Sequence, residues 1–369
     1  MRGSVSTVSR ELRIAIAGCG AIARAVHIPI LASMAGVRIT ALADTDSVTL
    51  ESAGRTVPAA ERHSGYQSLL AAETIDAIVI ASSPGTHAAA AVAAFEKGLS
   101  VYLEKPLASS VADGDSIISA WRRAGTVGMI GFNYRFNPLY VRLKRELESE
   151  RIGQIVAVRS VFSTASRPLP EWKKTRAAGG GVLLDLGSHH VDLIRFLLGQ
   201  EVKQSIAHLR SIGSEHDTAT LELTTTGGIS VQSFFSLGAV DEDRIEIYGD
   251  KGKLVVDRMA SLDVEHFPSS AGRADRVLRL GRRMLGLRNA GYIFAKLRSP
   301  MNEPSFRSSL DHFVAAIRGD TDASPGLDDG YASLAAIVTA EAARPASDPM
   351  SHLDLTIPAG ISRAGYLSR

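Results

Sequence analysis

Several features that would indicate particular classes of protein are missing from this sequence. It contains one cysteine, Cys19, which excludes an intramolecular disulfide framework and a cysteine-rich zinc site, and which suits a reducing compartment. Lys and Arg number 41 against 39 Asp and Glu, so the basic excess typical of nucleic-acid and membrane-surface proteins is absent. No apolar run approaches the roughly 20 residues that a membrane-spanning helix needs.

The first ten residues also lack the apolar core of a secretory signal, and we expect residues 1–10 to form a flexible tail. These absences predict a cytoplasmic protein with no nucleic-acid or membrane partner. Hydrophobic residues make up 45% of the chain and charged residues 22%, which is the balance of a globular protein. Because 369 residues exceed one ordinary core, we predict two domains, over residues 11–131 and 132–369.

The first predicted domain alternates short apolar runs with helical stretches. The runs contain no polar alternation, which indicates strands buried on both faces of a parallel sheet. This order of βαβ units predicts an α/β domain of the Rossmann type. The predicted strands are Leu12–Ala17, Arg38–Ala43, Ala77–Ala81, Ser100–Leu103 and Val127–Ile130, and the predicted helices are Ala21–Met34, His87–Lys97 and Ser109–Ala124.

After Gly131 the pattern changes. Asn137-Pro138 is a favourable helix start, with Asn as the N-cap and Pro in the first turn. Six strand candidates follow, and Gly227-Gly228 and Asp250-Lys251-Gly252 are hairpin signals between them. We therefore predict an α+β domain built on an open, mostly antiparallel sheet. The six candidates are Ile155–Phe162, Val202–Ser211, Thr218–Thr225, Ile229–Ser236, Arg244–Gly249 and Lys253–Asp257.

A glycine loop, Gly18-Cys19-Gly20-Ala21-Ile22-Ala23, directly follows the first strand and opens a helix. Gly18 permits a tight turn, and Gly20 allows the backbone to approach a pyrophosphate at the helix N-terminus. Asp44 ends the second strand, where a carboxylate accepts hydrogen bonds from the adenosine ribose. Since a carboxylate repels a 2′-phosphate, the pattern predicts a dinucleotide site that favours NAD over NADP.

Two further clusters carry candidate catalytic groups. Glu104-Lys105-Pro106 follows the fourth predicted strand of the sheet, at the edge where such folds bind ligands, and Pro106 restricts the backbone of Lys105. In the second domain, a glycine run leads into a predicted helix that places Asp185, His189 and Asp192 on one face. His189 is suited to proton transfer, with Asp185 orienting it. A satisfied polar stripe and a metal site are the alternatives for this face.

These segments, in this order, resemble the Gfo/Idh/MocA oxidoreductases, the glucose–fructose oxidoreductase and inositol dehydrogenase family. The resemblance covers nearly the whole chain. One departure is Ser-Pro-Gly after the third predicted strand, where the family often has Thr-Pro-Asn. The segments that carry the resemblance are Gly18–Ala23, Ser82–His87, Glu104–Pro106, Gly131–Pro138, Gly179–Asp192 and Ser305–Gly319.

The resemblance implies hydride transfer between a nicotinamide and a hydroxyl or ketone carbon of a sugar, cyclitol or sugar derivative, at a site between the two domains. It implies Lys105, Asp185 and His189 as the catalytic residues, no metal, and a homo-oligomer, either a dimer or a tetramer. The cofactor contacts are expected at Gly18, Gly20, Ala21, Ile22, Asp44, Ser82, Ser83, Pro84, His87, Glu104 and Lys105, and the substrate contacts at Tyr134, Arg135, Arg176 and Asp192.

Two alternatives of other classes remain: a glycosidase that uses bound NAD for transient oxidation, and a sensor that keeps the cofactor fold without chemistry. Intact Lys105, Asp185 and His189 argue against the sensor. The basic segment Arg273–Arg298 is not a general feature of the family. It is interpreted either as a rim that attracts an anionic substrate or as a solvated amphipathic helix, and we favour the helix.

Overall fold

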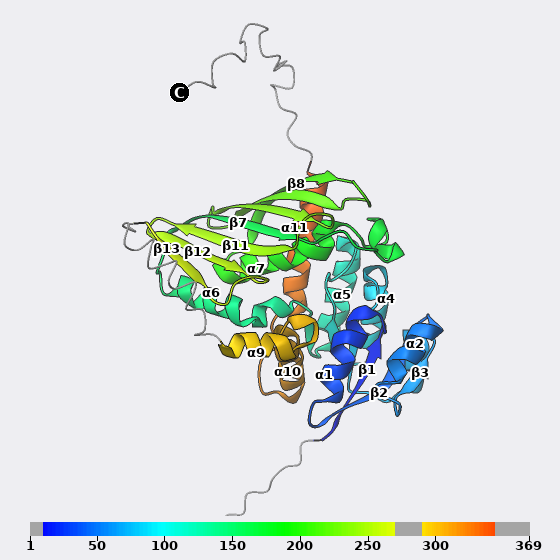
Figure 1. Ribbon diagram of the computed structural model, residues 1–369. Helices are drawn as coiled ribbons and strands as arrows, with labels where there is room; N and C mark the ends of the chain where they lie inside the picture. Colours follow the sequence, from blue (N-terminus) through cyan, green and yellow to red (C-terminus); the bar gives the residue numbers. More distant parts are fainter. Residues whose placement is uncertain (1–9, 270–289, 344–369) are drawn as a thin grey trace, which may run out of the picture.

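The computed structural model describes residues 10–269 and 290–343, and in this part the chain builds two sheets with helices between and around them (Figure 1). The first sheet has six parallel strands in the order β3-β2-β1-β4-β5-β6, which is the doubly wound arrangement of a Rossmann fold. Its strands are β1 (Leu12–Ala17), β2 (Val37–Ala43), β3 (Glu61–His63), β4 (Ala77–Ile80), β5 (Ser100–Leu103) and β6 (Gly128–Ile130).

Helices cover both faces of this sheet, as the apolar strand sequences require. Successive residues of β1 point to opposite sides, so Ile14 and Ile16 enter one core while Ala15 and Ala17 enter the other. The helices of this part are η1 (Ala23–His27), α1 (Ile28–Ala32), α2 (Ser47–Gly54), α3 (Tyr66–Ala72), α4 (Pro84–Glu96) and α5 (Val111–Ala124). The predicted helix Ala21–Met34 is thus divided, because its first turn, η1, is a π-helix.

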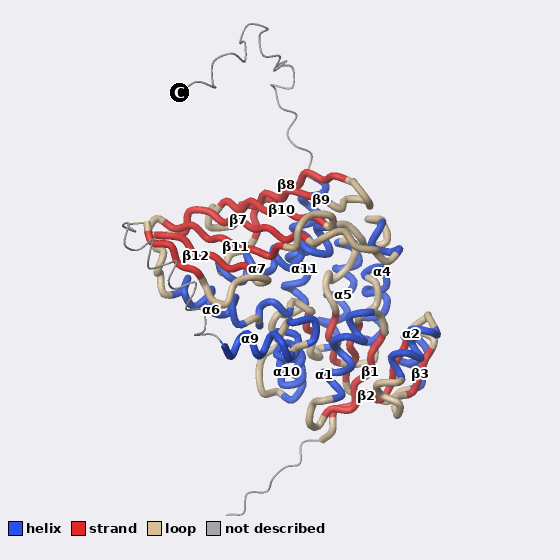
Figure 2. Tube along the Cα trace, viewed as in Figure 1, coloured by secondary structure: helices blue, strands red, loops and turns tan. Residues whose placement is uncertain are grey.

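The second sheet has seven strands in the order β13-β12-β11-β7-β10-β9-β8. Neighbouring strands of this sheet are antiparallel except β7 and β10, which run parallel, so the sheet is mixed, with mostly antiparallel pairs as predicted. Figure 2 shows these strands as one layer with the helices on one side of it. The strands are β7 (Ile155–Ser163), β8 (Val202–Arg210), β9 (Thr218–Thr225), β10 (Ser230–Ser236), β11 (Glu242–Gly249), β12 (Gly252–Asp257) and β13 (Glu265–Pro268).

The later helices join the two sheets. Leu310 and Phe313 of α10 pack in the core that contains Ile14 and Ile16, so a helix from the end of the chain completes the first sheet. α11 contacts β8 of the second sheet and α5 and β6 of the first part. The remaining helices are η2 (Asn133–Phe136), α6 (Pro138–Glu148), η3 (Glu171–Lys174), η4 (Leu183–Gly187), α7 (Ser188–Leu198), α9 (Ala290–Arg298), η6 (Pro300–Asn302), α10 (Ser305–Arg318) and α11 (Leu327–Ala342).

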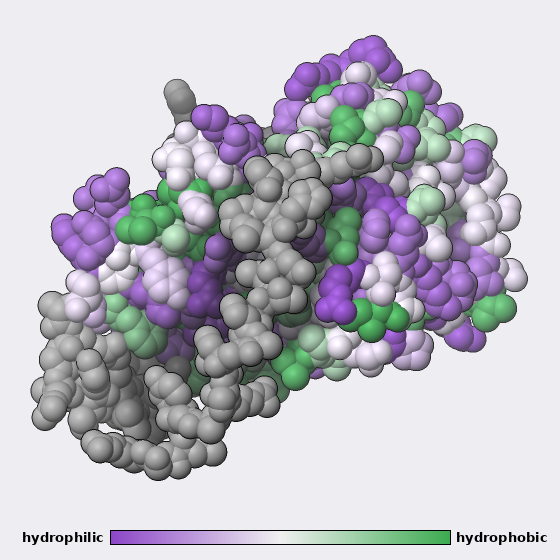
Figure 3. Space-filling view, turned by 90° about the horizontal axis from the view of Figure 1, so that it is seen from above, coloured by the Kyte–Doolittle hydropathy of each residue, from purple (hydrophilic) through white to green (hydrophobic). Residues whose placement is uncertain are grey.

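The surface agrees with the composition. On the face shown in Figure 3, hydrophilic residues predominate and hydrophobic residues form small separate patches. Within residues 10–269 and 290–343, no helix has the length and apolar character needed to cross a bilayer. Most of the predicted basic segment lies outside the described residues; its described end is α9, where Lys296 donates hydrogen bonds to the carbonyls of Arg258 and Met259.

Candidate active site

The glycine loop lies between the end of β1 and η1, and its geometry suits a dinucleotide. Gly18 has φ +90°, and a Cβ there would lie 2.3 Å from the backbone nitrogen of Ser82, so glycine is required by the fold. A Cβ on Gly20 would meet no protein atom within 4 Å, which leaves room for a close ligand. Ala21 and Ile22 continue the loop into η1. The loop therefore fits the pyrophosphate of a nicotinamide dinucleotide.

Asp44 follows β2 and lies beside this loop. Its Oδ2 accepts a hydrogen bond of 2.7 Å from the backbone N–H of Cys19, and its Oδ1 accepts one of 2.9 Å from Asp46. These bonds fix the carboxylate where a ribose can reach it. Arg24 of η1 is close as well, since its charge lowers the pKa of Asp46 after the larger effect of the Thr49 hydrogen bonds. Sequence reasoning missed Arg24 because it lies before Asp44 in the chain.

His87 ties together two loops at the edge of the first sheet. Its ring is fully buried, with Nδ1 2.9 Å from the carbonyl oxygen of Pro106 and Nε2 3.2 Å from that of Ser82. Burial lowers its pKa, and the two carbonyl oxygens oppose this effect in part. Ser83 and Pro84 begin α4 in the loop that His87 holds. His87 thus connects the loop of Ser82, a predicted cofactor contact, with the loop of Pro106.

Glu104 links the glycine-loop helix to the turn that carries Lys105. Its Oε1 is 2.8 Å from Nε2 of buried His27 on η1, and its Oε2 accepts a hydrogen bond from the backbone N–H of Lys105. Burial raises the pKa of Glu104. The hydrogen bond and the charge of His27, with smaller contributions from Lys105, lower it by more, so the pKa lies below its ordinary value. The ionised Glu104 therefore positions the backbone of the turn that carries Lys105.

Lys105 reaches across to the second part of the chain and contacts Asp185. Its Nζ donates hydrogen bonds of 2.8 Å to the Asp185 carbonyl and 3.1 Å to Oδ1. The other carboxylate oxygen, Oδ2, accepts a 2.6 Å bond from Nζ of Lys173 on η3. Burial raises the pKa of Asp185, but the two ammonium groups outweigh it and hold the pKa below its usual range. Two lysines thus share one carboxylate.

His189 lies beside this group on α7 and stacks on Tyr134. The two ring centroids are 4.2 Å apart with 19° between the planes. Burial, with a smaller contribution from the charge of Lys105, lowers the pKa of His189 well below its ordinary value. Its Nδ1 is buried without a hydrogen-bond partner among the described residues.

The relation between Asp185 and His189 corrects one expectation. Asp185 does not orient His189, because its carboxylate oxygens bind Lys105 and Lys173 instead. Charge-assisted bonds to ammonium groups are stronger than a bond to a neutral imidazole. In addition, η4, which precedes α7, is a π-helix. It interrupts the regular α-helix that was expected to place Asp185 and His189 on one face.

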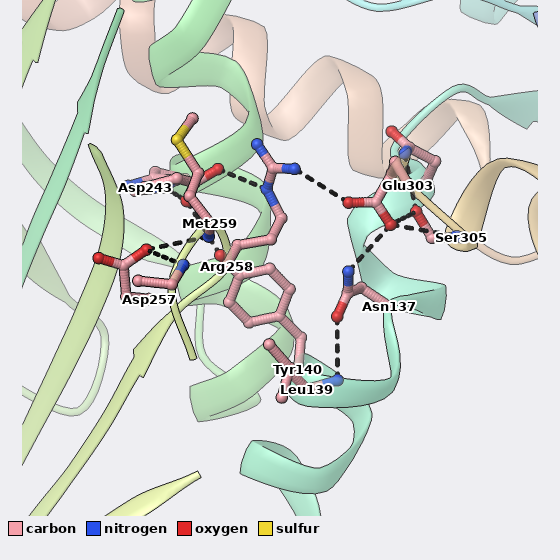
Figure 4. Close-up of polar contacts among 12 residues, drawn as sticks. Asn137, Leu139, Tyr140, Asp243, Asp257, Arg258, Met259, Glu303 and Ser305 are labelled. Carbon is pink, nitrogen blue, oxygen red and sulfur yellow. Dashed lines mark hydrogen bonds and ion pairs between the residues drawn. The ribbon is translucent and has the colours of Figure 1, made fainter. Parts of the chain in front are cut away.

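A buried ion-pair network lies behind Tyr134, and Figure 4 shows Arg258 between Asp243 and Glu303. The Arg258 Nε donates a 2.6 Å bond to Asp243 Oδ2, and its NH1 donates a 3.0 Å bond to Glu303 Oε2. The Arg258 guanidinium carbon lies 4.4 Å from the ring centroid of Tyr134. His190 adds a further bond to Asp243. This network, which sequence reasoning missed, supports the ring on which His189 rests.

The remaining predicted substrate contacts occupy ion pairs. Arg135 binds both carboxylate oxygens of Asp192, at 2.9 and 2.6 Å, and Asp192 is 1% exposed. Burial, opposed by Arg135, raises the pKa of Asp192 to about 6. Arg176 pairs with Glu341 of α11 at 2.8 Å. Of the four predicted contacts, Tyr134 is the residue that stacks on His189.

Comparison with known proteins identifies the family. The model of an oxidoreductase family with an NAD-binding Rossmann fold matches residues 12–132, and the model of the GFO/IDH/MocA C-terminal domain matches residues 140–255. The chain belongs to the GFO/IDH/MocA oxidoreductase family. This confirms the resemblance inferred from the motifs, and it makes the protein an enzyme of the oxidoreductase class.

Individual relatives agree with this assignment. Inositol 2-dehydrogenase 2 of Saccharopolyspora erythraea is 32% identical over 266 residues, which cover 69% of this chain and 76% of the relative. The WlbA dehydrogenase of Bordetella pertussis, solved with NADH and UDP-GlcNAcA, superposes with a TM-score of 0.76 at 24% identity, covering 90% of this chain and 96% of the other.

A 3-ketoreductase from Actinomadura kijaniata, solved with NADP and TDP-benzene, has a TM-score of 0.74 at 19% identity, covering 90% and 98% of the two chains. The two solved structures share the fold with this chain and carry different nicotinamide dinucleotides. Fold likeness therefore does not distinguish NAD from NADP, and the choice depends on the residues around Asp44.

Proposed function

We propose that this enzyme transfers a hydride reversibly between NAD and a secondary alcohol or ketone carbon of a sugar, cyclitol or sugar derivative. The observation that carries the proposal is the convergence of Lys105, Asp185 and His189. Lys105 follows a strand of the first sheet, and its Nζ meets Asp185 beside the helix of His189. The carboxyl edge of a parallel sheet is where doubly wound folds bind ligands.

The bound nicotinamide supplies the hydride chemistry, and the residues of the chain supply binding, orientation and proton transfer. The neutral His189 is suited to take the hydroxyl proton during oxidation and to return it during reduction. The ammonium of Lys105 uses two of its three donors on Asp185, and within residues 10–269 and 290–343 the third has no partner, so it can serve the reacting oxygen. A hydrogen bond there stabilises the negative charge that develops on that oxygen.

The cofactor residues fit a nicotinamide dinucleotide, with the pyrophosphate at Gly18 and Gly20 and the ribose at Asp44. The carboxylate of Asp44 supports NAD over NADP as the proposed cofactor. We retain Ala21, Ile22, Ser82, Ser83 and Pro84 as proposed cofactor contacts. We propose that His87 and Glu104 hold in place the loops that carry these contacts.

We also propose that the enzyme is a homo-oligomer of the cytoplasm. The single buried cysteine supports a reducing compartment. A broad groove on the outer face of the seven-stranded sheet supports self-association, since it mixes charges of both signs with an aromatic ring. Its lining includes Arg159, Glu222, Phe234, Arg244 and Glu246. The molar mass in solution tests this part of the proposal.

The function is tested by following NADH formation with a panel of aldoses, polyols and cyclitols. We expect turnover of at least one class of compound, and a loss of about 10²–10⁴-fold in kcat for Lys105→Met. The lysine-to-methionine change keeps the length of the side chain but removes the donor. Glycoside cleavage without net NADH would instead support the glycosidase alternative, and full activity of Lys105→Met would contradict the proposed site.

A further inference from the structure

The catalytic site contains more positive than negative charge. Lys105 and Lys173 bind opposite oxygens of Asp185, at 3.1 and 2.6 Å. The three side chains are 17%, 20% and 11% exposed, so the group is largely shielded from water. A third cation, exposed Arg167, is near enough that its charge lowers the pKa of Lys173, behind larger effects of burial and neighbouring side chains. One carboxylate thus holds two ammonium groups, and a further cation lies near Lys173.

Around Lys173, neighbouring charges do not correct this imbalance. The ionised Glu104 interacts with Lys105 and His27, whereas Asp185 is the carboxylate that acts on Lys173. Lys174 pairs with Glu171, and Arg176 pairs with Glu341. His189 is neutral at physiological pH because burial and Lys105 lower its pKa. Arg167 makes no ion pair with any residue in the described ranges 10–269 and 290–343. A substrate that closes this site against water therefore meets a residual positive charge.

The hydrogen-bond donors lead to the same conclusion. An ammonium group has three donors and no acceptor. Lys173 spends one donor on Asp185 Oδ2, and no other hydrogen bond of its Nζ occurs within the described residues, so two donors remain. Two free donors on a cation match two oxygens of an anionic group. A neutral ring offers hydroxyls but no charge, whereas an anionic group offers both the acceptor oxygens and the charge that complement these donors.

We propose that the substrate carries an anionic group, a carboxylate or a phosphate, and that Lys173 recognises it. This inference rests on the proposed function, in which Lys105 donates a hydrogen bond to the oxygen on the reacting carbon. Lys105 and Lys173 are held by the two oxygens of a single carboxylate, so the anionic group lies close to the reacting hydroxyl. The substrate is therefore an acidic sugar or a sugar phosphate in which the charge and the reacting carbon belong to one sugar unit.

Matched substrates test the proposal on the intact enzyme. Glucose, glucuronate and glucose 6-phosphate differ in charge on a common ring, and galactose with galacturonate forms a second series. We expect kcat/KM for one charged compound to exceed that for its neutral partner by about 10–100-fold, the range of a hydrogen bond to a charged group. A preference for glucuronate identifies a carboxylate as the source of the charge, and one for the phosphate ester identifies a phosphate.

The decisive variant is Lys173→Gln, and Lys174→Gln is its matched control. Lys174 is the neighbouring residue, and it pairs with exposed Glu171 instead of Asp185. Because Lys173 also contacts Asp185, Lys173→Gln is expected to lower all rates, so the measured quantity is the ratio of charged to neutral kcat/KM. We expect that ratio to fall about 10-fold or more in Lys173→Gln. Equal loss for both substrates would overturn the proposal and leave Lys173 as a positioning residue for Asp185.

A binding measurement separates this inference from the proposed reaction. The chain has two tryptophans, and the Trp172 ring lies 5.3 Å from Nζ of Lys173. In a Trp121→Phe background, fluorescence therefore reports on the Lys173 site without turnover. We expect glucuronate or glucose 6-phosphate to change the emission and Lys173→Gln to abolish that change. If no sugar is turned over but this binding persists, the reaction is refuted and the anionic site stands; turnover of neutral sugars alone, without binding of either anion, refutes the site.

Discussion

The two sides of the active site are built in different ways. On the cofactor side, the chain presents backbone groups and strand ends. Position 18 must be glycine there, because a Cβ would collide with the backbone of the neighbouring loop. On the substrate side, it presents buried side chains held by ion pairs, such as Arg258 between Asp243 and Glu303. The first construction makes a general surface for a common ligand. The second sets charges one by one, so it can define a particular substrate and proton path.

The largest expected effect comes from removing the groups that join the two sides. Lys105→Met and His189→Asn are each expected to lower kcat by about 10²–10⁴-fold, while NAD binding measured by calorimetry stays close to wild type. The double variant should lose less than the product of the two single losses, because groups that act as a unit are not additive. Losses that multiply would show that the two residues act in separate steps.

The substrate side should also be the more fragile when one of its buried charges is removed. Arg258→Met leaves Asp243 and Glu303 without their cation, so we expect the free energy of unfolding in urea to fall by about 3–5 kcal/mol. Arg151→Met is the control, since Arg151 pairs with Glu146 while 49% exposed, and its loss should stay within about 1 kcal/mol. Similar losses for both variants would contradict the structural role given to Arg258.

On the cofactor side, single side chains should tune specificity more than stability. Asp44→Ala removes the charge that repels a 2′-phosphate and leaves Arg24 nearby, so the ratio of NAD to NADP affinity should fall by roughly 10-fold, the scale of one charge contact. Calorimetry with both dinucleotides measures that ratio, and Arg24→Ala in the same background should restore part of it. Tighter binding of NADP than of NAD by the wild type would contradict the role given to Asp44.

The smallest effect concerns pH. A histidine with lowered pKa stays in its base form as the pH falls through 6.5 and gains its proton only well below that value. Between pH 7.5 and 6.0, kcat/KM for oxidation should therefore fall by less than about 1.5-fold, whereas an unperturbed imidazole predicts about 4-fold. An acid limb centred near pH 6.5 would show that His189 is not the base or is not buried during the reaction.

The sequence predicted the parts that depend on local patterns. β1 and β5 have the predicted ends, and Asn137 caps α6 through a 2.9 Å bond to the N–H of Leu139, as the Asn-Pro pair indicates. The short strand Glu61–His63 was missed because three polar residues show no apolar periodicity. These local signals are set by a few neighbouring residues, which is why they can be read without the fold.

The pairing of charges could not be predicted in the same way. Lys173 meets Asp185 across a glycine run, and Arg258 meets Glu303 from 45 positions away along the chain. No spacing rule relates such residues, because tertiary packing alone decides which carboxylate each cation reaches. The same reason explains why the ion pair between Arg135 and Asp192 was not predicted.

The return of α10 to the first sheet has a consequence for how the chain is made. During synthesis β1 leaves the ribosome early, but Leu310 and Phe313, which cover Ile14 and Ile16, come nearly three hundred residues later. Until then η1, α1 and α2 pack on that face of the sheet, but the apolar residues that α10 covers stay exposed, and exposed apolar surface attracts chaperones or other chains. A fragment ending at residue 131 is accordingly expected to aggregate when expressed alone, and adding α10 in trans should improve its solubility.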